Sequence, residues 1–463
     1  MMLWNKLREW MLEHPAQTVQ EKEATMTYEE LVVYSEMLVK ALSGQACCAI
    51  YCHSEMAAAM ALLGCFAAGV TAVPVSPRYG KEHCRKILKF ISPTCVLTDQ
   101  YGDLGIYYIE DSTYRMPETP PALILCTSGT TGNPKGVMLS EENILCNVSD
   151  IAQYFKVTEE DSVLIARPLY HGAVLTGEFL LSIIKGMRIV FHSESFNPIK
   201  ILELLKTSKV TTFGTTPTLA QMMFRFYRDK GEIAMKNLVI SGECLNEVTA
   251  RRIREAVPNV SIYHVYGLTE ACPRVSSLPP CEFSEHPTSV GYPLQSVKLS
   301  VRKGRKSLPP GEEGMLWVKG KNVMMGYYND PELTKRTLVN GWLRTGDMAK
   351  IDENGLLYIL GRADDMIIRA GMNIYPQEIE AELKKDSRTK EVLVYGLEDA
   401  KMGVQIAMKI AGQYDTVEDV RELCKNCLPP YQIPAHIELV ESLPKNGTGK
   451  VIRGKQMRGK QND

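Results

Sequence analysis

The segment 56–75 contains no charged residue, and this constrains the fold more than any other feature of the chain. Its length is that of a membrane span, which needs about twenty strongly apolar residues. Two glycines and a proline interrupt the segment, however, and alanine dominates its first half. We therefore predict no membrane span, and expect a helix over 55–68, a turn at Gly69 and a strand over 71–75. Such a unit is typical of an α/β fold whose parallel strands are buried on both faces.

The neighbouring sequence alternates between helix and strand in the same way. Thr27 and Glu30 form a capping box that opens a helix, and Gly44 ends this helix. The elements expected next are a strand, a helix and a strand, at 47–51, 80–91 and 95–98. The charged N-terminal stretch predicts an amphipathic helix that Pro15 ends. Alternation of helices and strands predicts a doubly wound α/β sheet.

The chain has 463 residues, more than a single core normally supports, which predicts two or more domains. Around Gly361 the sequence changes to a charged turn, Arg362-Ala-Asp-Asp365. We place the domain boundary there, with one domain over 1–361 and a second over 362–463. The second domain reads as strand–helix–strand–strand–helix, a small α+β unit.

Charge and cysteine content exclude several functions. The net charge of −1 does not favour a nucleic-acid partner. Of 13 cysteines only Cys424 and Cys427 have CxxC spacing, and no second pair accompanies them, so neither zinc nor redox chemistry is expected. An odd number of cysteines and no signal peptide predict a reducing compartment, the cytoplasm.

Residues 127–136, TSGTTGNPKG, give the strongest indication of function. A strand-like run precedes them, glycines permit sharp turns, and exposed N–H groups on such a turn form an anion site. Lys135 is followed by Gly136, so the motif is not a P-loop, although a surface linker has a similar composition. The groups expected to hold polyphosphate are Thr127, Ser128, Gly129, Thr130, Thr131, Gly132 and Lys135.

This loop resembles the phosphate-binding signature of the adenylate-forming superfamily, which contains acyl- and aryl-CoA synthetases, peptide-synthetase adenylation domains and firefly luciferase. Other segments resemble the remaining motifs in the family's order: MTYEEL at 26–31, GVTAVPVSPR at 69–78, VYGLTE at 265–270, GYYNDPELT at 326–334, GWLRTGD at 341–347, GRADDMIIRAGMNIYPQEIE at 361–380, LPPYQIP at 428–434 and PKNGTGKVIR at 444–453. The resemblance implies doubly wound α/β subdomains plus a β-rich subdomain in the large N-terminal domain, and a small mobile C-terminal α+β domain.

The resemblance also implies a reaction. ATP activates a carboxylic acid to acyl-AMP with release of pyrophosphate, and the acyl group then passes to the thiol of CoA, so ATP, Mg²⁺ and CoA are expected. Such a site must bring two anions together and stabilise the charge of the leaving pyrophosphate. Amino-acid-activating relatives have an aspartate where His171 stands here, and the segment 371–380 resembles the CoA-ligase pattern. A stand-alone enzyme that loads a carrier protein, and an inactive binding protein, are the alternatives.

Roles follow residue by residue from the resemblance. Catalysis is assigned to Lys450, which would bridge the substrate carboxylate and the α-phosphate, to Glu270 and Thr127 as magnesium ligands, to Thr269 at the α-phosphate, and to His171 as a gate. Nucleotide binding is assigned to Gly242, Glu243, Cys244, Tyr266, Gly267 and Leu268. Asp347 would accept the ribose hydroxyls, and Arg362 would add a second contact to ribose or phosphate. Asp364 would be the hinge and Gly371 would border the thiol tunnel. The acyl pocket is expected along 171–177, 215–218, 241–243 and 267–271.

Several of these residues also have a plainer interpretation. His171 has the sequence context of a packed loop histidine, and Asp364 that of a β-turn aspartate. Glu243 stands where relatives more often have alanine, which leaves the size and polarity of the pocket open.

Overall fold

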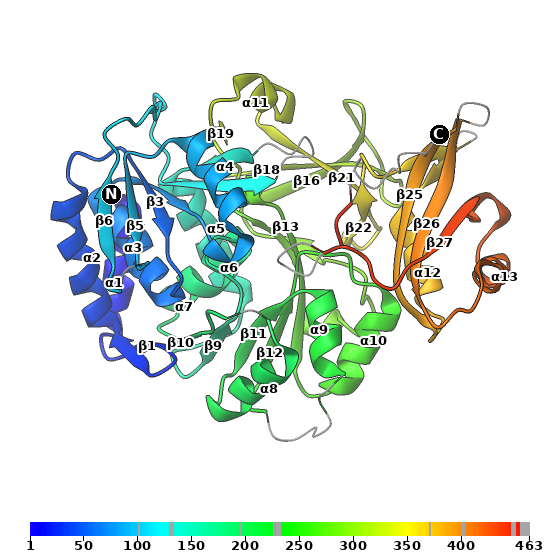
Figure 1. Cartoon of the computed structure of the whole chain (residues 1–463), viewed down its shortest axis with the longest axis horizontal. Coiled ribbons are helices and arrows are strands. Elements are labelled where there is room, and N and C mark those ends of the chain that lie inside the picture. The colour runs from blue at the N-terminus through cyan, green and yellow to red at the C-terminus, as the bar shows by residue number, and fades with distance from the viewer. Residues whose placement is uncertain are drawn as a thin grey trace.

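The computed structural model describes residues 1–100, 102–128, 134–194, 196–225, 227, 233–369, 372–399, 403–445 and 451–453. Two large sheets with helices on their faces make up most of the chain, followed by a β-rich unit and a C-terminal α+β unit (Figure 1). This is the α/β architecture that the sequence predicted, and no helix in the described ranges is long and apolar enough to cross a membrane.

The first large sheet has seven strands in the order β19-β8-β7-β4-β3-β5-β6. Its central strands are parallel, while β8, β19 and β6 pair antiparallel at the two ends. The strands are β3 (Cys47–Tyr51), β4 (Thr71–Pro74), β5 (Cys95–Thr98), β6 (Gly105–Tyr108), β7 (Leu123–Ser128), β8 (Pro134–Leu139) and β19 (Gly326–Tyr327).

The second large sheet has nine strands in the order β15-β14-β13-β12-β11-β9-β10-β1-β2. Six central strands are parallel, and antiparallel strands close both edges. The strands are β1 (Thr18–Glu21), β2 (Ala24–Thr27), β9 (Ser162–Ile165), β10 (Arg188–Phe191), β11 (Thr212–Thr215), β12 (Asn237–Ile240), β13 (Ser261–Gly267), β14 (Arg274–Leu278) and β15 (Tyr292–Pro293).

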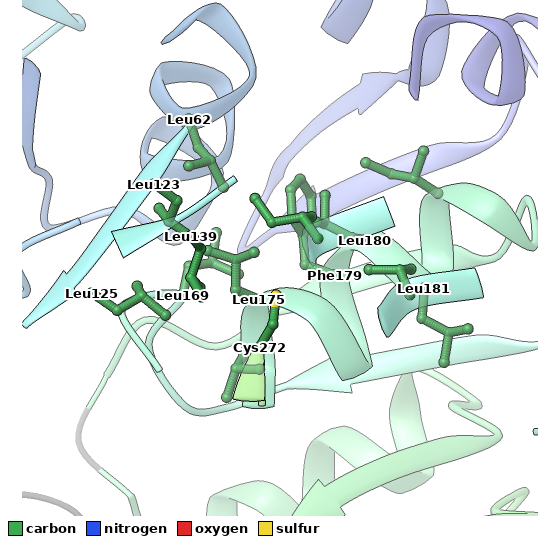
Figure 2. Packing of buried hydrophobic residues seen from close by; sticks show 14 of the residues in the cluster. Leu62, Leu123, Leu125, Leu139, Leu169, Leu175, Phe179, Leu180, Leu181 and Cys272 are labelled. Atoms are coloured by element: carbon green, nitrogen blue, oxygen red, sulfur yellow. The ribbon is translucent and has the colours of Figure 1, made fainter. Parts of the chain in front are cut away.

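Helices cover the faces of both sheets, and a π-helical turn over Leu175–Leu180 lies in the largest core cluster (Figure 2). Side chains of this turn meet leucines from α3, β7 and β8 there. The helices are α1 (Met2–Glu13), α2 (Tyr28–Leu42), α3 (Glu55–Ala68), α4 (Lys81–Ile91), α5 (Glu141–Tyr154), α6 (Gly172–Val174), α7 (Leu181–Ile184), α8 (Pro198–Thr207), α9 (Pro217–Phe224), α10 (Glu247–Ala256) and α11 (Pro331–Thr337).

The β-rich unit is an antiparallel six-stranded sheet. Its strands are β16 (Val297–Lys303), β17 (Lys306–Ser307), β18 (Gly314–Gly320), β20 (Leu338–Val339), β21 (Trp342–Ile351) and β22 (Leu357–Arg362). The last two strands form a hairpin in which Asp347 is the register partner of Arg362. The sheet therefore ends at the charged turn 362–365, where the sequence predicted the domain boundary.

The C-terminal unit has a hydrophobic core of its own, whose buried residues all come from the segment 367–428. Its elements are β23 (Ile367–Arg369), β24 (Met372–Ile374), α12 (Pro376–Leu383), β25 (Thr389–Asp399), β26 (Gly403–Gly412), α13 (Val417–Cys427) and β27 (His436–Leu439). The predicted order is correct from α12 to α13, but the structure has two strands, β23 and β24, where one was predicted before α12. Strand β27, which pairs parallel to β26, was also missed.

The N-terminal elements follow the predictions closely. Thr27 caps α2 with a reciprocal capping box to Glu30. Helix α3 ends at Gly69, whose φ of 70° is in the left-handed region that favours glycine. The uncharged segment is therefore a buried helix–turn–strand unit. All 13 cysteines are free thiols.

Candidate active site

The predicted phosphate loop joins two antiparallel strands. Thr127 at the end of β7 pairs with Lys135 at the start of β8, and Ser128 pairs with Pro134. The two described ends of the predicted loop are therefore paired as neighbouring strands. Gly129, Thr130, Thr131 and Gly132 lie outside the described residues.

Tyr327 brings the predicted magnesium ligand and the loop lysine to one place. Its hydroxyl donates a hydrogen bond to Glu270 Oε1 at 2.8 Å, and Lys135 Nζ lies 5.9 Å from the centre of its ring. Burial, followed by the charge of Glu270, raises the pKa of Tyr327, so the phenol stays protonated and donates. Strand pairing causes this convergence, because β19 pairs with β8 and places Tyr327 opposite Val137.

Asp347, the predicted ribose acceptor, is buried and held from two sides. Its Oδ2 accepts the hydroxyl of Tyr266, and its Oδ1 accepts Arg362 Nη1 at 3.0 Å. Burial and the neighbouring carboxylate raise the pKa of Tyr266, so this hydroxyl also remains a donor. Tyr266, Asp347 and Arg362 were predicted separately from the sequence to contact the nucleoside. In the structure, hydrogen bonds connect them into one group.

Gly346 is required next to this group. Its φ is 78°, and a Cβ at this position would lie 2.7 Å from Arg362 Nη2. Any side chain would both strain the backbone and displace the guanidinium from Asp347. The TGD sequence at 345–347 thus has a physical reason for its glycine.

Glu243 lies at the edge of the predicted acyl pocket. Its Oε2 accepts hydrogen bonds from the backbone N–H of Thr218, at 3.2 Å, and from its hydroxyl, at 2.6 Å. The carboxylate therefore ties two of the predicted pocket segments together. The preceding Gly242 has a φ of 90°, and both Gly242 and Cys244 are exposed.

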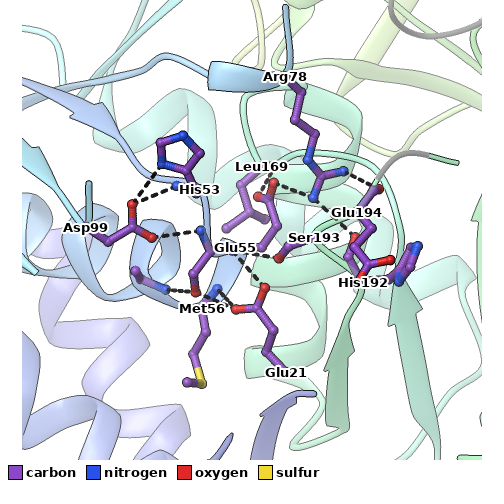
Figure 3. Close-up of polar contacts among 12 residues, drawn as sticks. Glu21, His53, Glu55, Met56, Arg78, Asp99, Leu169, His192, Ser193 and Glu194 are labelled. Atoms are coloured by element: carbon purple, nitrogen blue, oxygen red, sulfur yellow. Dashed lines mark hydrogen bonds and ion pairs between the residues drawn. The ribbon is translucent and has the colours of Figure 1, made fainter. Parts of the chain in front are cut away.

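A buried carboxylate network holds the loop that carries His171 (Figure 3). Glu55 at the start of α3 accepts the backbone N–H of Leu169 at 2.9 Å and pairs with Arg78 at 3.0 Å. Arg78 also donates to the carbonyl oxygen of His192 at 3.2 Å. The network fixes the backbone two residues before His171.

His171 is neutral in this environment. Burial, with the nearby cations Arg167 and Arg78, lowers the pKa of His171 to about 3. Its ring lies edge-on to Tyr170, with the centroids 5.0 Å apart, and His171 precedes the first residue of α6. The predicted gate is therefore an uncharged ring at the entrance to a helix.

Comparison with known proteins decides the family. A family model described as "AMP-binding enzyme" matches residues 7–328, and one described as "AMP-binding enzyme C-terminal domain" matches residues 378–450. The chain belongs to the AMP-binding enzyme family. The first match alone covers more than half of the 463 residues.

Relatives of this AMP-binding enzyme are CoA ligases. It is 31% identical over 423 residues to the 2-succinylbenzoate–CoA ligase of Bacillus pumilus (strain SAFR-032), which covers 87% of this chain and 85% of the relative. It is 28% identical over 422 residues to a feruloyl-CoA synthase of Amycolatopsis sp, covering 86% of this chain and 85% of the relative.

Solved structures that superpose on this chain are also those of a CoA ligase. The O-succinylbenzoate coenzyme A synthetase of Bacillus subtilis in complex with AMP superposes with a TM-score of 0.86 at 27% identity, covering 99% of both chains. The same enzyme in complex with ATP and magnesium superposes with a TM-score of 0.84 at 28% identity, covering 97% of this chain and 98% of that one. The AMP-binding enzyme described here is an AMP-forming acid–CoA ligase that uses ATP, magnesium and CoA, as the sequence predicted.

The remaining predicted residues of the AMP-binding enzyme divide into two groups. Thr269 and Glu270 share a short 3₁₀ turn directly after β13, the strand that carries Tyr266 and Gly267, and Leu268 links the two. Asp364 is exposed in the turn that follows β22. Lys450 and Gly371 lie outside the described residues.

The flanks of Lys450 are nevertheless placed. Lys445 and Val451 form an antiparallel bridge, and Ile452 donates its N–H to the carbonyl oxygen of Pro444 at 2.9 Å. Arg453 pairs with the buried Glu380 of α12. The two ends of the predicted lysine segment are therefore held together on the C-terminal unit.

Sequence reasoning missed Tyr327 and Glu55 as contributors to the site. Tyr327 lies within the GYYNDPELT segment, so its motif was noticed but its hydroxyl was not. Glu55 had a weak signal, being a carboxylate beside a long uncharged segment. Such a residue is rarely buried unless it is paired.

Proposed function

We propose that this AMP-binding enzyme activates an aromatic or aryl-alkyl acid, and that the residues assigned above perform the reaction. The relatives named for 2-succinylbenzoate and ferulate support the class of acid. The observation that carries the assignment of residues is the connected group at Asp347. One buried carboxylate oriented by a tyrosine and an arginine can accept both hydroxyls of a ribose, because each of its oxygens has two lone pairs.

The nucleotide would lie between two tyrosines. On one side, Tyr266 and Asp347 would hold adenosine, with 242–244 along the adenine edge. On the other, Thr127 and Lys135 with the rest of the loop would hold the β- and γ-phosphates, and Thr269 the α-phosphate. Tyr327, which contacts Glu270 and Lys135, supports this arrangement because it joins the loop to the turn after β13.

The residues present fit a magnesium ion. Glu270 uses Oε1 to accept Tyr327, which leaves Oε2 for a metal, and Thr127 is the proposed second ligand. Within the described ranges no group of three His, Cys, Asp or Glu side chains could hold a metal. Magnesium needs no such cage, since it often takes one or two protein carboxylates plus phosphate oxygens. When bound, it would neutralise charge on the departing pyrophosphate.

Four further residues complete the proposed chemistry. Lys450 would bridge the substrate carboxylate and the α-phosphate, which offsets the repulsion between the two anions as the acyl–phosphate bond forms. The neutral ring of His171 would close the acyl pocket during adenylation and open it for the thiol. Rotation of the C-terminal domain at Asp364 would move Lys450 out of the site. It would bring in the segment around Gly371, which would line the tunnel for the thiol.

We also propose the domain boundary at 361/362 and a cytoplasmic location. The separate core that begins at Ile367 supports the boundary. Free thiols at all 13 cysteines support a reducing compartment.

The function is tested with purified protein, ATP, magnesium and a panel of acids, including 2-succinylbenzoate, ferulate, benzoate and a fatty acid. Acid-dependent release of pyrophosphate, followed by acyl-CoA when CoA is added, is the expected result. Preference for a fatty acid would contradict the proposed class of acid. Transfer only to a phosphopantetheinylated carrier protein would contradict CoA as the acceptor.

A further inference from the structure

A cluster of charged residues lies buried beside the expected acyl pocket. Arg167 pairs with Glu178 at 2.5 Å, and the side chains of the two are 14% and 6% exposed. Arg274 at the start of β14 is 4% exposed. Hydrophobic pockets for simple acyl chains do not need three buried charges, because each charge costs free energy to desolvate.

Two glycines make room for this cluster. A Cβ on Gly177 would lie 2.6 Å from Arg274 Nη2, and a Cβ on Gly214 would lie 2.4 Å from Glu178 Oε1. Gly177 ends the pocket segment 171–177, and Gly214 directly precedes the segment 215–218. The charged groups therefore lie against backbone that belongs to, or directly precedes, two of the predicted pocket segments.

The charges of the cluster do not balance. Glu178 forms its ion pair with Arg167. No ion pair joins Arg274 to a carboxylate in the described part of the chain. The side chain of Arg274 hydrogen-bonds through Nη1 to the hydroxyl of Tyr154, and burial raises the pKa of that phenol, which is therefore neutral. Among the described residues, no carboxylate pairs with the buried positive charge of Arg274.

The π-helical turn explains how this arrangement is reached. It carries both Gly177 and Glu178, and a π turn shifts the side chains that follow it relative to a regular helix. π-Helical turns occur often at functional sites for this reason. Here the turn directs Glu178 toward β11 and places the backbone of Gly177 against Arg274.

We propose that Arg274 binds a second acidic group on the acid substrate, so that the enzyme selects acids with an anion remote from the reacting carboxylate. This inference rests on the proposed acid–CoA ligase function. An arginine suits this role, since its planar guanidinium recognises carboxylates with paired hydrogen bonds. A buried cation left unpaired is costly, and a substrate anion would complete the pair.

The first test compares acids that differ only in the remote carboxylate. The pairs are 2-succinylbenzoate with 4-oxo-4-phenylbutanoate, terephthalate with benzoate, and hexanedioate with hexanoate. We expect kcat/KM for pyrophosphate release to favour the diacid by about 30-fold or more in at least one pair, as for a buried charge pair. Equal or better use of the monoacid in all three pairs would overturn the proposal.

The second test uses Arg274→Gln, Arg274→Lys and Arg188→Gln. In Arg274→Gln we expect kcat/KM to fall about 30-fold for the preferred diacid and to stay within about threefold for its monoacid partner. Arg274→Lys should keep part of the preference. Arg188→Gln is the matched control, because Arg188 on β10 bonds the carbonyl oxygen of Ser208 and should leave the preference unchanged. A preference that survives in Arg274→Gln would overturn the proposal.

Calorimetric titration separates this inference from the proposed function. Binding of each acid pair to the native protein requires no turnover. Tighter binding of a diacid than of its monoacid partner, lost in Arg274→Gln, would support the role of Arg274 even if no acid released pyrophosphate. Equal binding of both members of every pair would contradict that role.

Discussion

At the scale of single residues, the site is organised by hydroxyls that orient carboxylates. Tyr266 orients Asp347 and Tyr327 orients Glu270, each as a donor to one oxygen. The other oxygen of Glu270, Oε2, is the proposed magnesium ligand, and the other oxygen of Asp347, Oδ1, accepts a hydrogen bond from Arg362. Both carboxylates are thus positioned before a nucleotide arrives, which reduces the ordering cost of binding.

Lys450 gives the sharpest prediction at this scale. Lys450→Ala should reduce acyl-adenylate formation by roughly two to four orders of magnitude, because a positioned charge is lost. Thioester formation from supplied acyl-adenylate should be nearly unaffected. Single-turnover assays of the two half-reactions measure this, with Lys445→Ala as the control. Equal losses in both half-reactions would refute the assignment.

His171 gives a prediction about pH. Its folded pKa of about 3 is below the usual value of 6.5, so its ring does not titrate between pH 5 and 8 in the folded protein. The pH profile of adenylation in His171→Gln should therefore keep the shape of the native profile. The depressed pKa also means that stability is lost as the pH falls below about 6.5, and His171→Gln should lose less. An acidic limb in the native profile that disappears in the variant would contradict a neutral gate.

At the scale of elements, the sequence was most informative where local signals decide the structure. The capping box at Thr27 and the left-handed turn at Gly69 are local, and α2, α3 and β4 were predicted nearly to the residue. Strand β27 was missed because its four residues alternate between exposed and half-buried, and they form a strand only by pairing with the distant β26.

The same reasoning explains which site residues were missed. Glu270 and Lys135 were predicted from motifs, but Tyr327 joins them only because β19 adds to β8 across almost two hundred residues. The cluster around Arg274 depends on a π-helical turn, which hydrophobic periodicity does not reveal. Contacts between distant segments are set by packing, so a single sequence carries little signal for them.

The turn between the two domains is tested by Asp364→Pro. Proline fixes φ and removes the backbone donor, which would stiffen the proposed hinge. Adenylation should persist while transfer to CoA falls by at least about tenfold, as for a mutation that slows a rate-limiting domain motion. Asp352→Pro is the control, because it places proline in the turn between β21 and β22, away from the proposed hinge. An unchanged overall rate in Asp364→Pro would place the hinge elsewhere.

The network at the start of α3 is tested by Glu55→Gln. Burial raises the pKa of Glu55 to about 7, although Arg78 opposes the shift. A raised folded pKa means that the native protein loses stability as the pH rises from about 4.5 to 7. Relative to Glu55→Gln, the native protein should lose up to about 3 kcal/mol across this window. Urea unfolding at pH 5 and pH 8 measures it, and a native protein that gains stability relative to the variant would contradict the shifted pKa.

At the scale of the whole molecule, two domains with separate cores contribute to the proposed site. The large domain supplies the groups around Asp347 and Glu270, whereas the segment that ends in Arg453 belongs to the C-terminal unit. Arg453 also lies close enough to Cys244 of the large domain for this thiol to affect the pKa of Arg453. Arg453 therefore lies near Cys244, one of the residues proposed to bind the nucleotide, and Lys450 is proposed to act in adenylation.

A substitution at Gly371 tests the domain arrangement that is proposed for transfer to the thiol of CoA. A bulky side chain, as in Gly371→Trp, should block thioester formation because it narrows the passage proposed for the thiol. Pyrophosphate exchange should be unaffected. Measuring both activities in the same preparation controls for folding. Loss of exchange together with thioester formation would place Gly371 at the adenylation site instead.

The most direct test of the central claim is mass analysis of the products formed from ATP, magnesium and an aryl acid, first without and then with CoA. The account predicts enzyme-bound acyl-AMP in the first reaction, acyl-CoA and free AMP in the second, and neither product in Asp347→Ala, which removes the proposed ribose acceptor. Formation of acyl-CoA with ADP instead of AMP, or full activity in Asp347→Ala, would contradict it.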